Sequence, residues 1–153
     1  TLIRFTFEEG GQLFLTLESH DFQADQATLF VIEGVTKHLE GRQVGNILNH
    51  LATRMHCASI VVFDCLTAAY VLRHKKLGER TAYRTVRELI TWGTDDPEAL
   101  VTGSGFGHIR VTRLDDIMAT HHFGGGYWYQ RLGTGVTNLP SHHVVVEASR
   151  SKI

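Results

Sequence analysis

Residues 58–73, which read ASIVVFDCLTAAYVLR, decide the fold of this chain. Their apolar side chains are compatible with two structures, because a short β-branched run and a buried helix look alike by periodicity. We expect a helix from about Ala58 to Arg73, which makes it one of several consecutive helices in the middle of the chain. A strand at residues 58–66 would remove this helix and the architecture built on it.

Helical patterns lie on both sides of this stretch. Residues 29–39 and 44–55 place apolar side chains three and four apart, which predicts two helices that end near Gly41 and His56. Residues 82–92 show the same period and predict a helix that ends at Trp92-Gly93.

Strands are expected at both ends of the chain and after the central helices. Alternation in residues 1–17 around a Gly-containing turn predicts a β-hairpin. Residues 99–102 and 108–113, separated by Gly-rich residues 103–107, predict a second hairpin with a flexible tip. The β-branched run at residues 144–146 predicts a further strand.

These elements predict a single α+β domain with a winged-helix-like helical core and flanking β-hairpins. A chain of 153 residues is long enough to bury one core. Residues 1–40 would form an acidic N-terminal hairpin and helix, residues 41–113 a winged-helix-like unit, and residues 114–153 the C-terminal strands.

Composition limits the function classes. Hydrophobic residues make up 42% and charged residues 20% of the chain, which argues against disorder and against a membrane-spanning protein. We therefore expect no membrane partner. Cys57 and Cys65 fit neither a zinc knuckle nor a disulfide framework, which favours a reducing, cytoplasmic compartment.

Basic residues concentrate in the middle of the chain. Residues 41–92 hold eight Lys/Arg against three Asp/Glu. In the predicted helix at residues 79–91, Arg80, Arg84 and Arg87 share one face, where guanidinium groups could meet guanine edges or phosphates. The candidate nucleic-acid-binding residues are Arg80, Thr81, Tyr83, Arg84, Arg87, Arg110 and Arg113, the last two from the second hairpin.

The sequence also resembles a known family. Residues 77–89, LGERTAYRTVREL, resemble the recognition-helix segment of winged helix-turn-helix regulators, in particular the TVYRTL of ferric-uptake-type repressors. Residues 47–51, ILNHL, resemble their first helix. The resemblance covers less than half of the chain and implies a DNA-binding regulator, for which a homodimer would suit paired half-sites. It does not extend to zinc ligands, because the chain has no CxxC motif.

Ten histidines form a second functional signal. If the chain is an enzyme, His122 and His143 are the candidate general acid and base for a phosphodiester. If it holds a metal ion, one histidine from each pair plus a third would give the set His108, His121 and His142. The sequence identifies no cofactor.

Three functions follow from these patterns. The first is a DNA-binding regulatory protein that uses a basic recognition helix and wing. The second is a small His-dependent phosphodiesterase or nuclease, or a metal-assisted hydrolase. The third is a non-catalytic protein-interaction subunit, in which the acidic first forty residues and the basic middle meet different partners.

Overall fold

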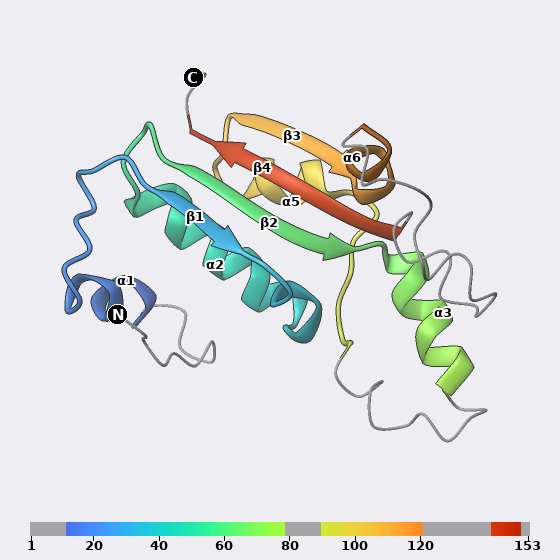
Figure 1. Cartoon of the computed structure of the whole chain (residues 1–153). Coiled ribbons are helices and arrows are strands. Elements are labelled where there is room, and N and C mark those ends of the chain that lie inside the picture. Colours follow the sequence, from blue (N-terminus) through green and yellow to red (C-terminus); the bar gives the residue numbers. More distant parts are fainter. Residues whose placement is uncertain (1–11, 79–89, 121–141, 151–153) are drawn as a thin grey trace.

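A computed structural model describes residues 12–78, 90–120 and 142–150 of the chain. Four strands form one mixed sheet in the order β1–β2–β4–β3 (Figure 1). β1 is parallel to β2, whereas β4 is antiparallel to both β2 and β3. The strands are β1 (Leu29–Ile32), β2 (Ile60–Leu66), β3 (His108–Arg113) and β4 (His143–Ser149).

Helices connect and cover the strands. They are α1 (Gln12–Glu18), the 3₁₀ turn η1 (Thr36–His38), α2 (Gly41–Arg54), α3 (Ala68–Gly78), α5 (Pro97–Gly103) and α6 (Leu114–Thr120). α2 and α5 lie together behind the sheet in Figure 1, and α3 continues from the end of β2. Of the residues that the structure describes, no helix is long and apolar enough to cross a membrane.

Residues 58–73, for which the sequence predicted one helix, form a strand followed by a helix. Residues 60–66 form β2, which pairs with β1 on one side and β4 on the other, and α3 begins only at Ala68. Val61, Phe63 and Cys65 are buried, whereas the residues between them are half-buried, as expected for a strand with one face in a core. The predicted helix from Ala58 to Arg73 is therefore wrong. The β-branched side chains of residues 60–62 fit a paired strand better than a helix.

This strand removes the winged-helix-like unit predicted for residues 41–113. The broader prediction of a mixed helix-and-sheet domain is confirmed, but its centre is a four-stranded sheet rather than a helical core with flanking hairpins. The helix predicted at residues 29–39 is also wrong, because residues 29–32 form β1 against β2 and only η1 follows. Pairing with a neighbouring strand outweighs the local helical spacing.

Of the remaining predicted elements, one helix and two strands are confirmed, whereas residues predicted as strands in both hairpins lie in helices. The helix at residues 44–55 and the strand at residues 144–146 are confirmed by α2 and β4. Residues 99–102 lie in α5, which begins at Pro97 and is capped by the Asp96 carboxylate, whereas residues 108–113 are the predicted strand. Residues 12–17 of the first predicted hairpin lie in α1, and residues 1–11 and 79–89 are outside the described parts.

The core lies between α2, α5 and one face of the sheet. Val44, Ile47, Leu48 and Leu51 of α2 are buried in one cluster with Val61, Phe63 and Val146 of the sheet. The opposite face is less covered: on β1, Leu29 is 61% exposed and Val31 is 62% exposed. Sheets that are parallel throughout are usually covered on both faces, whereas antiparallel pairs can leave one face to solvent. The described residues therefore leave an apolar sheet face open.

Substitution of Leu48 tests which side of the sheet holds the core. Leu48 on α2 is 1% exposed and Leu72 on α3 is 59% exposed. We expect Leu48→Ala to lower the free energy of unfolding by about 2 to 5 kcal/mol, because it leaves a cavity among buried side chains. Leu72→Ala is the matched control and should lower it by less than about 1 kcal/mol. Urea denaturation followed by circular dichroism would measure both; equal losses would contradict this core.

Candidate functional site

Two acidic residues stand at the edge of the sheet where the parallel strands end. Glu33 directly follows β1, and Asp64 lies near the end of β2. Ile32 pairs with Phe63, so the next residue along each strand brings Glu33 and Asp64 side by side. α2 joins the two strands. In open α/β sheets, ligands bind outside the carboxyl ends of such parallel strands.

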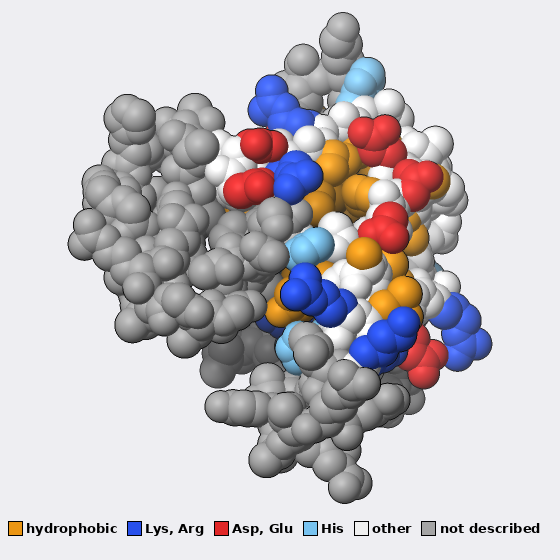
Figure 2. Space-filling view, turned by 90° about the vertical axis from the view of Figure 1, so that its right-hand side faces the viewer, with side chains coloured by type: hydrophobic (Ala, Val, Ile, Leu, Met, Phe, Trp, Pro, Cys, Tyr) orange, Lys and Arg blue, Asp and Glu red, His pale blue; other side chains and the backbone are white. Residues whose placement is uncertain are grey.

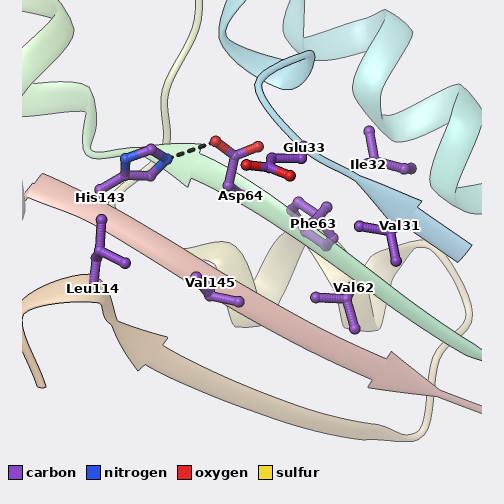
Figure 3. A pocket seen from close by; sticks show the side chains of 9 residues that line it. All are labelled: Val31, Ile32, Glu33, Val62, Phe63, Asp64, Leu114, His143 and Val145. Atoms are coloured by element: carbon purple, nitrogen blue, oxygen red, sulfur yellow. Dashed lines mark hydrogen bonds and ion pairs between the residues drawn. The ribbon is translucent and has the colours of Figure 1, made fainter. Parts of the chain in front are cut away.

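Hydrogen bonds hold the Asp64 carboxylate in place. Its Oδ1 accepts a bond from the backbone N–H of Gly34 at 2.7 Å, and its Oδ2 lies 2.6 Å from Nε2 of His143 (Figure 3). Gly34 has a φ of 69°, a conformation that costs glycine little and most other residues more. The turn after β1 thereby aims its N–H at Asp64.

His143 reaches this carboxylate from the start of β4. Asp64 is paired with Val145, so His143 is its diagonal neighbour across the strands. Diagonal side chains on one sheet face are within reach of each other when one is long. The side chains of His143 and Asp64 are only 20% and 13% exposed. The pair is therefore largely shielded from water.

The charge of Asp64 is stabilised by its surroundings. Burial by itself would raise its pKa, but the hydrogen bonds from His143 and Gly34, together with the positive charges of His143 and Lys37, outweigh burial and lower the pKa below its ordinary value. Asp64 is thus ionised at neutral pH.

A pocket of about 260 Å³ opens beside the pair. Its floor is apolar and includes Val31, Val62 and Val145, on the open face of the sheet (Figure 3). Its polar side chains are those of Glu33, Asp64 and His143. An apolar floor with a few converging polar groups is the usual composition of a small-molecule site.

Two of the three histidines predicted as metal ligands, His108 and His142, lie far apart. His108 pairs with Ser149 at one end of β4, whereas His142 immediately precedes the other end, roughly 20 Å away at strand spacing. Nδ1 of His142 instead lies 3.0 Å from the Thr67 hydroxyl. His121 is outside the described ranges, and within those ranges no group of three or more His, Cys, Asp or Glu side chains could hold a metal ion.

The other predicted site residues are dispersed. Arg110 on β3 is opposite Glu147 of β4, and Arg113 forms an ion pair with Asp115 at 3.1 Å. Of the predicted general acid and base, only His143 is described, and its partner is Asp64. The recognition-helix residues Arg80, Thr81, Tyr83, Arg84 and Arg87, together with His122, lie outside the described residues.

Sequence reasoning missed Glu33, Gly34 and Asp64. Their signal is an acidic residue at the end of a short apolar run, in FVIEG at residues 30–34 and in VVFD at residues 61–64. That signal points to a sheet edge only if both runs are strands, and we assigned both to helices.

Comparison with known proteins supports the fold. No protein-family model and no curated protein sequence matches the chain. A DUF574 family protein from Streptomyces avermitilis aligns with 97% of this chain and 54% of its own chain, with a TM-score of 0.58 and 9% sequence identity. The chain thus spans about half the length of that protein and shares its fold.

Two further similar structures are named as methyltransferases. A SAM dependent methyltransferase from Archaeoglobus fulgidus aligns with 87% of this chain and 64% of its own, at 10% identity and a TM-score of 0.48. Phospholethanolamine N-methyltransferase 2 from Haemonchus contortus, in complex with S-adenosylhomocysteine, aligns with 86% of this chain and 35% of its own, at 10% identity and a TM-score of 0.49. Both similarities are weaker than the first.

The predicted function as a DNA-binding transcription regulator is wrong. The winged helix on which it rested is replaced by a sheet with β2 at its centre, and the chain shares this fold with the Streptomyces protein. On the face in Figure 2, basic, acidic and histidine side chains are mixed around apolar patches rather than forming a basic surface. These similarities also support neither the phosphodiesterase nor the interaction subunit.

Asp64 should make the stability of the chain depend on pH. Because its pKa is lower in the folded state, its contribution is present above the ordinary pKa of 3.8 and is lost as the pH falls through the lower folded value. We expect Asp64→Asn to cost about 1 to 3 kcal/mol at pH 7 and much less below pH 3. Urea unfolding at both pH values measures this difference. The exposed Glu98 on α5 provides the control Glu98→Gln, and an equal cost of Asp64→Asn at both pH values would contradict the assignment.

Proposed function

We propose that this chain is part of a methyltransferase-like enzyme, and that the carboxyl edge of β1 and β2 binds the amino-acid end of S-adenosylmethionine. The main support is the position of Glu33 and Asp64 side by side at the ends of two parallel strands joined by a helix. This is where α/β sheets bind their ligands. The names of the similar methyltransferases suggest S-adenosylmethionine as the first ligand to test.

The two carboxylates differ in whether hydrogen bonds within the chain already occupy them. Asp64 is already hydrogen-bonded to Gly34 and His143. Glu33 is exposed, and within the described residues no hydrogen bond or ion pair occupies its carboxylate. An exposed carboxylate beside a pocket can accept charge-assisted hydrogen bonds from the cationic α-amino group of the ligand. Glu33 is therefore the residue assigned to that contact.

The described residues offer a contact for the amino-acid end of S-adenosylmethionine. Among them, no glycine-rich turn connects a strand to the helix that follows it, which is the usual cradle for a nucleotide. The contacts to adenosine are therefore not assigned to any of the described residues. When bound, S-adenosylmethionine would supply a methyl group on a sulfonium centre.

Binding of S-adenosylhomocysteine to the chain tests this function by calorimetry. We expect Glu33→Gln to weaken binding by about 10-fold or more, because a charge-assisted hydrogen bond contributes about 1.5 to 3 kcal/mol. Glu98→Gln, which changes an exposed carboxylate on α5, should leave the affinity unchanged.

A ligand without the α-amino group tests whether Glu33→Gln weakens binding through the contact with that group or through a wider change in the site. 5′-Methylthioadenosine should bind wild type and Glu33→Gln equally, because it lacks the cationic α-amino group whose hydrogen bond Glu33 would accept. Absence of saturable S-adenosylhomocysteine binding to the wild-type chain would reject the proposed function. Equal affinity of wild type and Glu33→Gln for that ligand would reject the role of Glu33.

A further inference from the structure

We propose that the Asp64–His143 pair is a general base that takes the proton from a hydroxyl group of the acceptor, so that the acceptor is a neutral phenol or alcohol rather than a carboxylate. This inference rests on the proposed function, because it concerns the second substrate of the same site. It assigns a catalytic role to His143 and a positioning role to Asp64.

The hydrogen bond between Asp64 and His143 determines the tautomer of the imidazole. Asp64 is ionised and can only accept, so Nε2 of His143 must carry the hydrogen in the 2.6 Å contact. In the neutral ring the lone pair is then on Nδ1. Within the described residues no hydrogen bond reaches Nδ1, and Figure 3 shows it on the side of the ring away from Asp64. Among the described residues, the nitrogen that can accept a proton is thus the one without a hydrogen-bond partner.

The position of the pair suits contact with a substrate. His143 lines the pocket beside Asp64, and one-fifth of its side chain remains exposed. The apolar floor at Val62 and Val145 excludes water from one side of the pocket and offers a surface to an aromatic ring or carbon chain. The imidazole is therefore held by a hydrogen bond to Asp64 and is still partly exposed.

Proton transfer to His143 balances a methyl transfer. As the acceptor oxygen bonds to the methyl carbon of a sulfonium donor, the carbon–sulfur bond breaks, its electron pair stays on sulfur, and the hydroxyl proton moves to Nδ1 of His143. The imidazolium that results is stabilised by the adjacent Asp64 carboxylate, as in other Asp–His pairs. Solvent then removes the proton.

The charges around the pocket favour a neutral acceptor. Among the described residues, the titratable groups that line the pocket with His143 are Asp64 on β2 and Glu33 after β1, and Lys37 on η1 acts on Asp64. Two carboxylates at the pocket repel an anionic substrate. A carboxylic acid is already ionised at pH 7 and needs no base, whereas a phenol with a pKa of about 10 does need one.

Nitrogen NMR of the imidazole tests the geometry without any methyl donor. At a pH where His143 is neutral, we expect its proton on Nε2 in wild type and a larger share of the other tautomer in Asp64→Asn. Addition of phenol should shift the Nδ1 resonance of His143 and leave that of His108, on β3 opposite the far end of β4, unchanged. A proton on Nδ1, or no shift on addition of phenol, would overturn the proposal.

Methyl transfer from S-adenosylmethionine to phenol and to benzoate tests the chemistry. We expect phenol to be the better acceptor, and His143→Gln to lower its rate by about 100-fold or more, the usual contribution of a general base. The loss should shrink as the pH approaches about 10, where phenol ionises by itself. His108→Gln is the matched control and should leave the rate unchanged.

The outcomes separate this inference from the proposed function. If S-adenosylhomocysteine binds equally to wild type and His143→Gln and phenol transfer falls only in the variant, both hold. If it binds but transfer is equal in both proteins, or benzoate is the better acceptor, the general base is rejected and the ligand site remains. If S-adenosylhomocysteine does not bind, the proposed function fails and the imidazole NMR alone decides whether the pair can accept a proton from a hydroxyl group.

Discussion

The pairing of β2 with β1 on one side and β4 on the other is the constraint on which the rest of the structure depends. β2 lies at the centre of both pairings, and seven of its residues are in register with β4. Its buried face meets α2 and closes the core, whereas its other face carries Asp64 toward the pocket. One strand therefore supplies both the main packing surface and the acidic centre of the candidate site, because successive side chains point to opposite faces.

The site is assembled from three separate parts of the sequence. Gly34 comes from the turn after β1, Asp64 from β2, and His143 from the start of β4, nearly eighty residues after Asp64. The hydroxyl of Thr36 also donates to the backbone carbonyl of Asp64, which ties η1 to the same strand. Each contact fixes a different atom of Asp64, so the carboxylate has little freedom. Such restriction costs side-chain entropy and is justified where a group must be aimed at a ligand.

The open face of the sheet fits the size comparison with the Streptomyces protein. Leu29 and Val31 are exposed on the edge strand β1, next to a pocket with an apolar floor. The chain aligns with only 54% of that protein. The candidate site has two carboxylates and an imidazole, and no glycine-rich nucleotide cradle lies among the described residues.

The sequence by itself predicted α2 from its 3.6-residue period and β4 from its β-branched run, and both predictions are confirmed. It also identified His143 as a candidate proton-transfer residue, but not Asp64 or Glu33. β1 and β2 were assigned to helices because their short apolar runs become strands only when neighbours are present to accept their backbone hydrogen bonds. The β-branched run at residues 60–62 is a local signal for a strand, but it does not distinguish a strand from a buried helix without knowledge of the pairing. Only the tertiary structure could therefore decide that residues 60–66 form the central strand, and that His143 lies beside Asp64 rather than beside another histidine.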